Sequence, residues 1–235
     1  MTGPVALVGA DAFRPEMSAF DTDLLAATGR RRPRVVIVPT AAFPGGQGEF
    51  SRWAAEGTEH FGALGAEVEA IAVGGRVVTD MGSAVQAIGE ADLVYLAGAE
   101  PEHIVRALAG SALLAAIVDA HRRGAVVAGC SGGAMALVDR VMGLRAGRLP
   151  WPLHWRPGLG VVEGVAVLPR YDRMPEAFAA LLALQAPRGT TVLGIDDGTA
   201  VVGRDGAWQV QRGARVTVWR GHRRERLRAG DVFRV

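Results

Sequence analysis

The sequence contains no lysine, only one cysteine and no long apolar run. All 26 basic residues are arginines, and 24 acidic residues reduce the formal net charge to +2. Such a small excess creates no strong positive field, so a nucleic-acid partner is not expected. The arginine-dense stretch 219–235 also contains Glu225 and Asp231. We therefore expect a solvated terminal strand there rather than a phosphate-binding patch.

The lone cysteine, Cys130, excludes an internal disulfide framework and a cysteine-based zinc cluster. No apolar run approaches the ~18 residues that a membrane helix needs. Residues 1–13 also lack the basic-then-apolar order of a signal peptide. These absences predict a cytoplasmic protein without a membrane partner. No metal or cofactor is expected, because the glycine-rich segment 45–48 (GGQG) lacks the Lys and Ser/Thr of a phosphate-binding loop.

Short apolar segments alternate with segments of helical periodicity along the first half of the chain. The apolar segments are near-continuous, as in strands buried on both faces, and they span 4–10, 34–41, 67–73, 92–98 and 125–129. Helices are predicted over 21–28, 49–65 and 110–124, with Ser111 as the N-cap of the last. The alternation predicts a parallel sheet covered by helices on both sides, with functional groups at the carboxyl ends of the strands.

The chain changes character after residue 145. A connection rich in Pro, Gly and Trp (147–160) leads to a strand-like segment and a helix over 175–184. The sequence Arg-Asp-Gly at 204–206 then separates alternating segments, which predicts a β-hairpin. No linker is long enough to divide the chain, so we predict a single domain over 1–235. The apolar hairpin strands could form an edge that pairs with a second copy in a homodimer.

The pentapeptide GCSGG (129–133) matches the pattern G-x-S-x-G and stands between a predicted strand and a helix-like segment. In that setting the glycines permit a tight turn that exposes the hydroxyl of Ser131, a nucleophile elbow. The amide of Gly132 can then face the same space as an oxyanion donor. The alternative is that Ser131 is an ordinary helix N-cap, since serine is favoured at caps. The strand-to-helix context favours the elbow.

Four ordered motifs resemble a known family: VYLAGAEPEHI (94–104), VVAGCSGGAMAL (126–137), GLGVVEGVAVLPRYD (158–172) and LGIDDGTAV (193–201). They are similar to motifs of the dipeptidase E and cyanophycinase family of serine peptidases, whose fold is similar to class I glutamine amidotransferase domains. The resemblance spans roughly residues 4–202.

The resemblance implies an α/β fold, a flavodoxin-like three-layer α/β/α domain with a mainly parallel central sheet. Here a C-terminal β-hairpin would extend it. Ser131 matches the nucleophile of the family, and Asp197 matches its acidic partner, shortened from Glu. The second oxyanion donor, from the turn after the fourth strand, falls at Gly98 and Ala99.

The sequence departs from the family at the general base, because Arg170 stands where such sequences carry a histidine after proline. Arginine cannot accept a proton at physiological pH, and a serine without a base is a poor nucleophile. His103, in the first turn of a helix opened by Pro101, and His154, in a Trp-flanked loop, are the candidates for a substitute base. The other histidines are interpreted as surface residues: His60, His121 and His222.

Arg170 could have a role of its own. Beside an elbow it could hold a substrate carboxylate bidentately, and Arg173 could help. The alternative, which we favour at this point, is that Arg170 is buried and pairs with Asp196 or Asp197 in the space of the missing histidine.

Three functions follow from these residues. The first is a serine-peptidase-like hydrolase of small, acidic peptides or related amides that uses Ser131. The second is a catalytically impaired protein that binds a carboxylated small molecule or a partner. The third is thiol chemistry of the amidotransferase type at Cys130. We rank it last, because Cys130 precedes the elbow position and should point into the fold.

Overall fold

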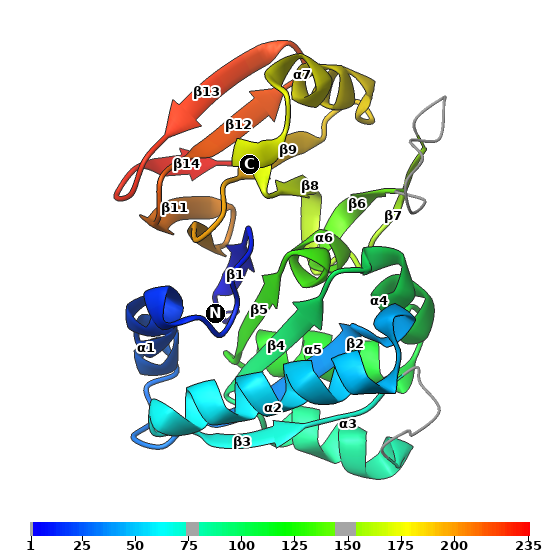
Figure 1. Ribbon diagram of the computed structural model, residues 1–235, viewed down its shortest axis with the longest axis vertical. Helices are drawn as coiled ribbons and strands as arrows, with labels where there is room; N and C mark the ends of the chain where they lie inside the picture. The colour runs from blue at the N-terminus through cyan, green and yellow to red at the C-terminus, as the bar shows by residue number, and fades with distance from the viewer. Residues whose placement is uncertain (1, 74–79, 144–153) are drawn as a thin grey trace.

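The first of two sheets contains the five strands that the apolar runs predict (Figure 1). The computed structural model describes residues 2–73, 80–143 and 154–235. The five strands are parallel, in the order β1-β5-β4-β2-β3. Their bounds are β1 (Val5–Val8), β2 (Arg34–Ala41), β3 (Glu67–Ala70), β4 (Leu93–Gly98) and β5 (Val126–Cys130). All residues of β1, β4 and β5 are buried, as their unbroken apolar sequences require.

Helices cover both faces of this sheet. On one face, α1 (Ser18–Ala27) and α2 (Gln47–Ala63) share a core cluster with β1, β2, β4 and β5. On the other face, a second cluster holds α3 (Met81–Glu90), α4 (Pro101–Leu108) and α5 (Ala112–Arg122). The Ser111 hydroxyl caps α5 by accepting the amide of Leu114 at 3.2 Å, as predicted. The α/β class and its three layers are therefore confirmed.

No single helix in the described ranges is long and apolar enough to cross a membrane. The pair α4 and α5 meets those criteria only when the two helices are taken together, and they are bent by 97° at the break between them.

Three antiparallel strands extend the first sheet beyond β1. They are β10 (Ala200–Arg204), β11 (Ala207–Arg212) and β14 (Val232–Arg234), in the order β14-β11-β10-β1. The predicted hairpin joins β10 to β11 through Asp205 and Gly206, whose φ angles are +51° and +78°. Two positive φ values are what a type I′ hairpin turn needs, and an Asp-Gly pair supplies them.

A second sheet, which the sequence analysis did not anticipate, follows the elbow. Its order is β13-β12-β9-β8-β6-β7, and it mixes parallel and antiparallel pairs. The helix α7 (Glu176–Gln185) packs on it. The strand bounds are β6 (Val138–Met142), β7 (Trp155–Pro157), β8 (Val162–Pro169), β9 (Thr191–Ile195), β12 (Val216–Arg220) and β13 (Arg223–Leu227).

The chain crosses between the two sheets four times, and two of these crossings meet at the carboxyl ends of β1 and β5. The short helix α6 (Gly132–Leu137) leads from β5 in the first sheet to β6 in the second (Figure 1). The turn from β9 to β10 crosses beside it, where the amide of Gly9 donates to the Thr199 carbonyl at 3.0 Å. Both crossings carry residues that the sequence analysis selected, Ser131 and Asp197.

Candidate active site

Ser131 occupies a strained turn between β5 and α6. Its φ and ψ angles are +53° and −116°, a region that residues with a side chain rarely adopt. The serine side chain makes no capping hydrogen bond to α6, so the N-cap interpretation is wrong. Backbone bonds hold the residue in place: its amide donates to the Val8 carbonyl at 3.0 Å, and its carbonyl accepts the Met135 amide at 3.0 Å. Such strain persists where the surrounding structure enforces it, commonly at active sites.

The elbow packs backbone to backbone against the end of β4. A Cβ atom at Gly133 would lie 2.1 Å from the Leu96 carbonyl oxygen, and one at Gly132 would lie 2.6 Å from the Ala99 carbonyl carbon. Gly98, at φ +114°, makes the turn that fits this space. The structure thus brings together Gly98, Ala99 and Gly132. As the first residue of α6, Gly132 has no intrahelical acceptor for its amide.

All five histidines lie in described parts of the chain, and none of them is hydrogen bonded to Ser131 there. His103 is half-buried at the third position of α4. His154 is exposed just before β7, where its carbonyl accepts the amide of Gly143 at 3.1 Å. The undescribed internal segments, 74–79 and 144–153, contain no histidine. Ser131 therefore lacks a bound imidazole among the described residues.

His60 is not the surface residue that its helix pattern predicted. Its side chain is only 9% exposed, and its Nε2 lies 2.8 Å from a carboxylate oxygen of Asp21. Asp21 is fully buried on α1, and this burial raises the pKa of its carboxyl group. His222 is exposed in the turn from β12 to β13, as expected, and His121 is half-buried at the end of α5. His60 therefore belongs to the packing of α1 against α2.

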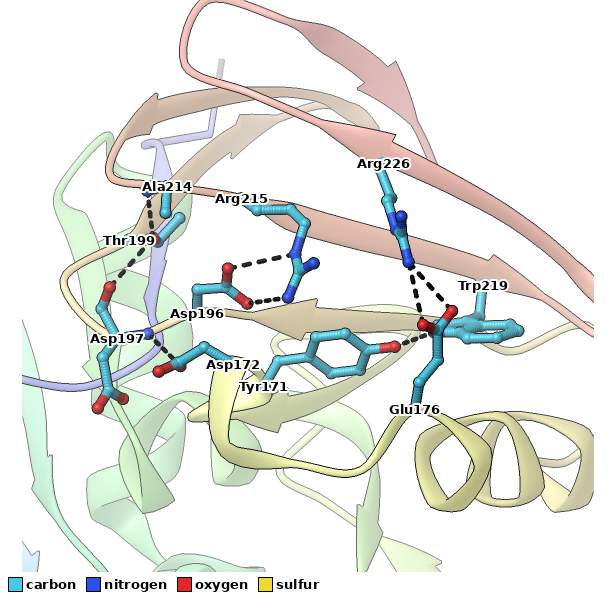
Figure 2. A network of polar contacts seen from close by, with 10 residues as sticks. All are labelled: Tyr171, Asp172, Glu176, Asp196, Asp197, Thr199, Ala214, Arg215, Trp219 and Arg226. Atoms are coloured by element: carbon cyan, nitrogen blue, oxygen red, sulfur yellow. Dashed lines mark hydrogen bonds and ion pairs between the residues drawn. The ribbon is translucent and has the colours of Figure 1, made fainter.

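Arg170 is exposed, and it forms no ion pair in the part of the chain that the structure describes. The expectation that it pairs with Asp196 or Asp197 is wrong. Asp197 pairs with Arg173 at 2.5 Å. Asp196 pairs with Arg215 at 3.2 Å (Figure 2). Arg170 directly follows β8 and is exposed, so its charge needs no buried partner.

Acidic and basic groups surround Asp197 on the turn after β9. Its side chain is 14% exposed, and its amide donates to Asp172 Oδ1 at 2.9 Å. Burial raises the pKa of the Asp197 carboxyl, and the negative charges of Asp172 and Asp11 raise it further. The guanidinium groups of Arg173 and Arg170 act in the opposite direction. Sequence reasoning missed Asp11, although its place directly after a buried strand is the signal that selects such residues.

Cys130 lies beneath the elbow with its thiol buried. Burial raises the pKa of this thiol to about 12, so it is protonated at neutral pH. A protonated, inaccessible thiol is not a nucleophile. The geometry therefore removes the support for thiol chemistry of the amidotransferase type.

No group of three His, Cys, Asp or Glu side chains that could hold a metal is found within residues 2–73, 80–143 and 154–235. A cavity of about 300 Å³ is lined by Gly3, Glu163 and Trp208, among others, and not by Ser131. Neither observation adds a group to the elbow.

Comparisons with known proteins agree with this geometry. The family model of peptidase family S51 matches residues 6–211. The chain belongs to peptidase family S51. This is the dipeptidase E and cyanophycinase family that the motifs resemble, and membership supports a serine-peptidase-like hydrolase. No curated protein sequence matches the chain.

Two solved structures share the fold of this S51 protein. A peptidase from an acI-B1 Actinobacterium has a TM-score of 0.85 and 27% sequence identity, covering 100% of this chain and 98% of the other. A protein assigned as a peptidase E from Listeria monocytogenes EGD-e has a TM-score of 0.69 and 16% identity, covering 91% of this chain and 100% of the other. At that identity the second match shows the fold alone.

Proposed function

We propose that this S51 protein is a serine-dependent hydrolase of small peptides or related amides, with Ser131 as the nucleophile. The observation that carries the proposal is the backbone of Ser131, strained at φ +53° and ψ −116° without a capping bond. A helix cap needs no such conformation, because cap residues normally have extended dihedrals. A nucleophile elbow does need it, since the sharp turn presents the hydroxyl to substrate.

In this mechanism the Ser131 Oγ attacks the carbonyl carbon of the scissile amide. The negative charge that develops on the carbonyl oxygen is stabilised by the amide of Gly132 and by the Gly98–Ala99 turn packed against it. The tetrahedral intermediate collapses with release of the amine, and water then hydrolyses the acyl-enzyme.

The hydroxyl proton must pass to an acceptor during the attack. Among the candidates we favour the carboxylate of Asp197, directly or through one water. Ser131 and the turn that carries Asp197 are both bonded to the end of β1, through Val8 and Gly9, and burial raises the pKa of the Asp197 carboxyl. Neither His103 nor His154 is hydrogen bonded to Ser131 within the described residues. We expect slow turnover, since loss of a triad member costs roughly 10⁴-fold or more.

The substrate is expected to carry a carboxylate. Arg170 is exposed beside the site, and Arg173 is 62% exposed while it contacts Asp197. A guanidinium group has five N–H donors, so Arg173 keeps donors for a ligand as well. These two charges favour an acidic peptide over a neutral one.

A fluorophosphonate probe, which reacts with activated serines, tests the nucleophile directly. Strong labelling of the wild type that disappears in Ser131→Ala would support the hydrolase. An unlabelled wild-type protein would refute it. Hydrolysis of Asp-containing dipeptides, followed with the same pair of proteins, then tests the substrate class.

The second candidate is a catalytically impaired binding protein. One observation favours it: Arg170 occupies the position of the family's histidine, and no histidine among the described residues is bonded to Ser131. This candidate predicts binding of carboxylates to the wild type without fluorophosphonate labelling or hydrolysis.

A further inference from the structure

Tyr171 is held from three sides by the second sheet. Its side chain is buried, and the ring lies flat on β9, where a Cβ atom at Gly194 would be only 2.2 Å from the ring carbon Cδ2. Its hydroxyl accepts the indole N–H of Trp219 at 3.0 Å. The guanidinium group of Arg215 lies 5.7 Å from the ring centroid. This residue has little freedom to move.

Tyr171 belongs to a short turn that begins and ends with an arginine. The 3₁₀ turn η3 (Tyr171–Arg173) follows Arg170, and the Arg173 amide donates to the Arg170 carbonyl at 3.0 Å. In Figure 2, Tyr171 extends toward Trp219, and Asp172 extends in the opposite direction toward Asp197. The turn is therefore tied on both sides.

The tie explains the backbone of Arg170. Its φ and ψ are +52° and +41°, a left-handed conformation that is unfavourable for a residue with a Cβ atom. A flexible turn would relax out of this conformation, so the fixed neighbours must maintain it. The bonds of Tyr171 and Asp172 supply that constraint.

We propose that Tyr171, fixed by Trp219, is a positioning residue that preforms a two-arginine clamp, Arg170 and Arg173, for a carboxylate of the substrate. The acidic substrate of this clamp is taken from the proposed function. Binding of a carboxylate by the clamp can nevertheless be measured without turnover. Because the turn is already ordered in the free protein, substrate binding does not have to supply the free energy needed to order it. The arginine at position 170 is then a built binding group rather than a remnant of a lost triad.

The test compares two probes that differ in one carboxylate, N-acetyl-aspartic acid α-amide and N-acetyl-asparagine amide. Isothermal titration gives the dissociation constant of each, and the ratio measures recognition of the carboxylate. We expect the wild type to favour the acid roughly tenfold or more, because hydrogen bonds to charged groups are worth that much. Arg170→Gln should remove most of this preference.

Tyr171→Phe keeps the ring and removes the acceptor for Trp219. We expect the preference for the acid to fall about fivefold, the effect of one lost hydrogen bond. Trp219→Phe removes the donor and should give the same result. In an Arg170→Gln background, Tyr171→Phe should have little further effect, since the two residues act as one unit.

Arg226→Gln is the matched control. It removes the bonds from Arg226 to Glu176, at 3.1 Å, and leaves Arg224 paired with Glu176 and placed over the Trp219 ring, so the preference should stay as in the wild type. Equal changes in both dissociation constants on Tyr171→Phe, with the ratio intact, would show a merely structural role and overturn the proposal. A wild type without preference for the acid would overturn it as well.

The clamp and the hydrolase can fail separately. Fluorophosphonate labelling reports on Ser131 alone, and the ratio of dissociation constants reports on the clamp alone. An unlabelled protein that shows the expected ratios would refute the hydrolase and support the clamp.

Discussion

Replacing Ser131 with glycine should make the protein more stable while it removes the proposed nucleophile. At φ +53° and ψ −116° the serine backbone stores roughly 1–3 kcal/mol of strain, which glycine does not suffer. Glycine also makes the unfolded chain more flexible, and this lowers the free energy of unfolding by about 0.4–1 kcal/mol. The difference of the two midpoints is a net gain of about 1.3 kcal/mol, or roughly 3–5 °C in Tm for a chain of this length.

Ser131→Ala is the control, because alanine loses the hydroxyl but keeps the Cβ atom and therefore the strain. Differential scanning calorimetry of the three proteins gives the comparison, and the glycine variant should melt above the alanine variant. If the two variants melt together, the elbow stores no strain, and the argument that function maintains this conformation fails.

Three further outcomes are expected. Arg170→His should raise kcat for Asp-containing dipeptides by roughly 10²-fold, because it restores a general base. The loss of the arginine should raise KM. An unchanged kcat would show that the triad geometry has been lost. Burial raises the pKa of Asp197 above its ordinary value of 3.8, so ionising this carboxyl in the folded protein costs free energy of unfolding. That cost grows as the pH rises above 3.8. Asp197→Asn should therefore raise Tm at pH 7 but not at pH 3, and an equal or lower Tm at pH 7 would contradict the sign. Gly133→Ala should cost about 3 kcal/mol or more in urea unfolding, because its Cβ would lie 2.1 Å from the Leu96 oxygen. Gly62→Ala, on the open face of α2, should be neutral or slightly stabilising, and similar losses in both variants would count against the close packing.

The buried strands could be predicted from sequence because each one is apolar on both faces. The segment 34–41 became β2 without any shift in bounds. The second sheet could not be predicted in the same way. The helix-like pattern after Ser131 extends to residue 141 in the sequence, but the helix ends at Leu137 and residues 138–142 form β6. The outer strand β13 carries mostly charged residues, so no apolar signal marks it.

The elbow could be located from sequence, whereas its charged partners could not. Gly132 and Gly133 are required because the start of α6 packs closely on the end of β4, and that requirement is visible as a motif. Ion pairing depends on which side chain reaches a carboxylate between the turns that flank β8, β9 and β12. Arg173 rather than Arg170 reaches Asp197. The two arginines are three residues apart in one turn, and no sequence pattern predicts which of them forms the ion pair.

Different sheets hold the two parts of the candidate site. Ser131 is held by the first sheet, whereas the turn 170–173 is held by the second. A substitution in that turn leaves the bonds of the elbow to β1 untouched. If the proposed roles hold, substrate preference can therefore change by mutation in the second sheet while Ser131 keeps its conformation in the first. The arginine at position 170 is a change that this arrangement tolerates.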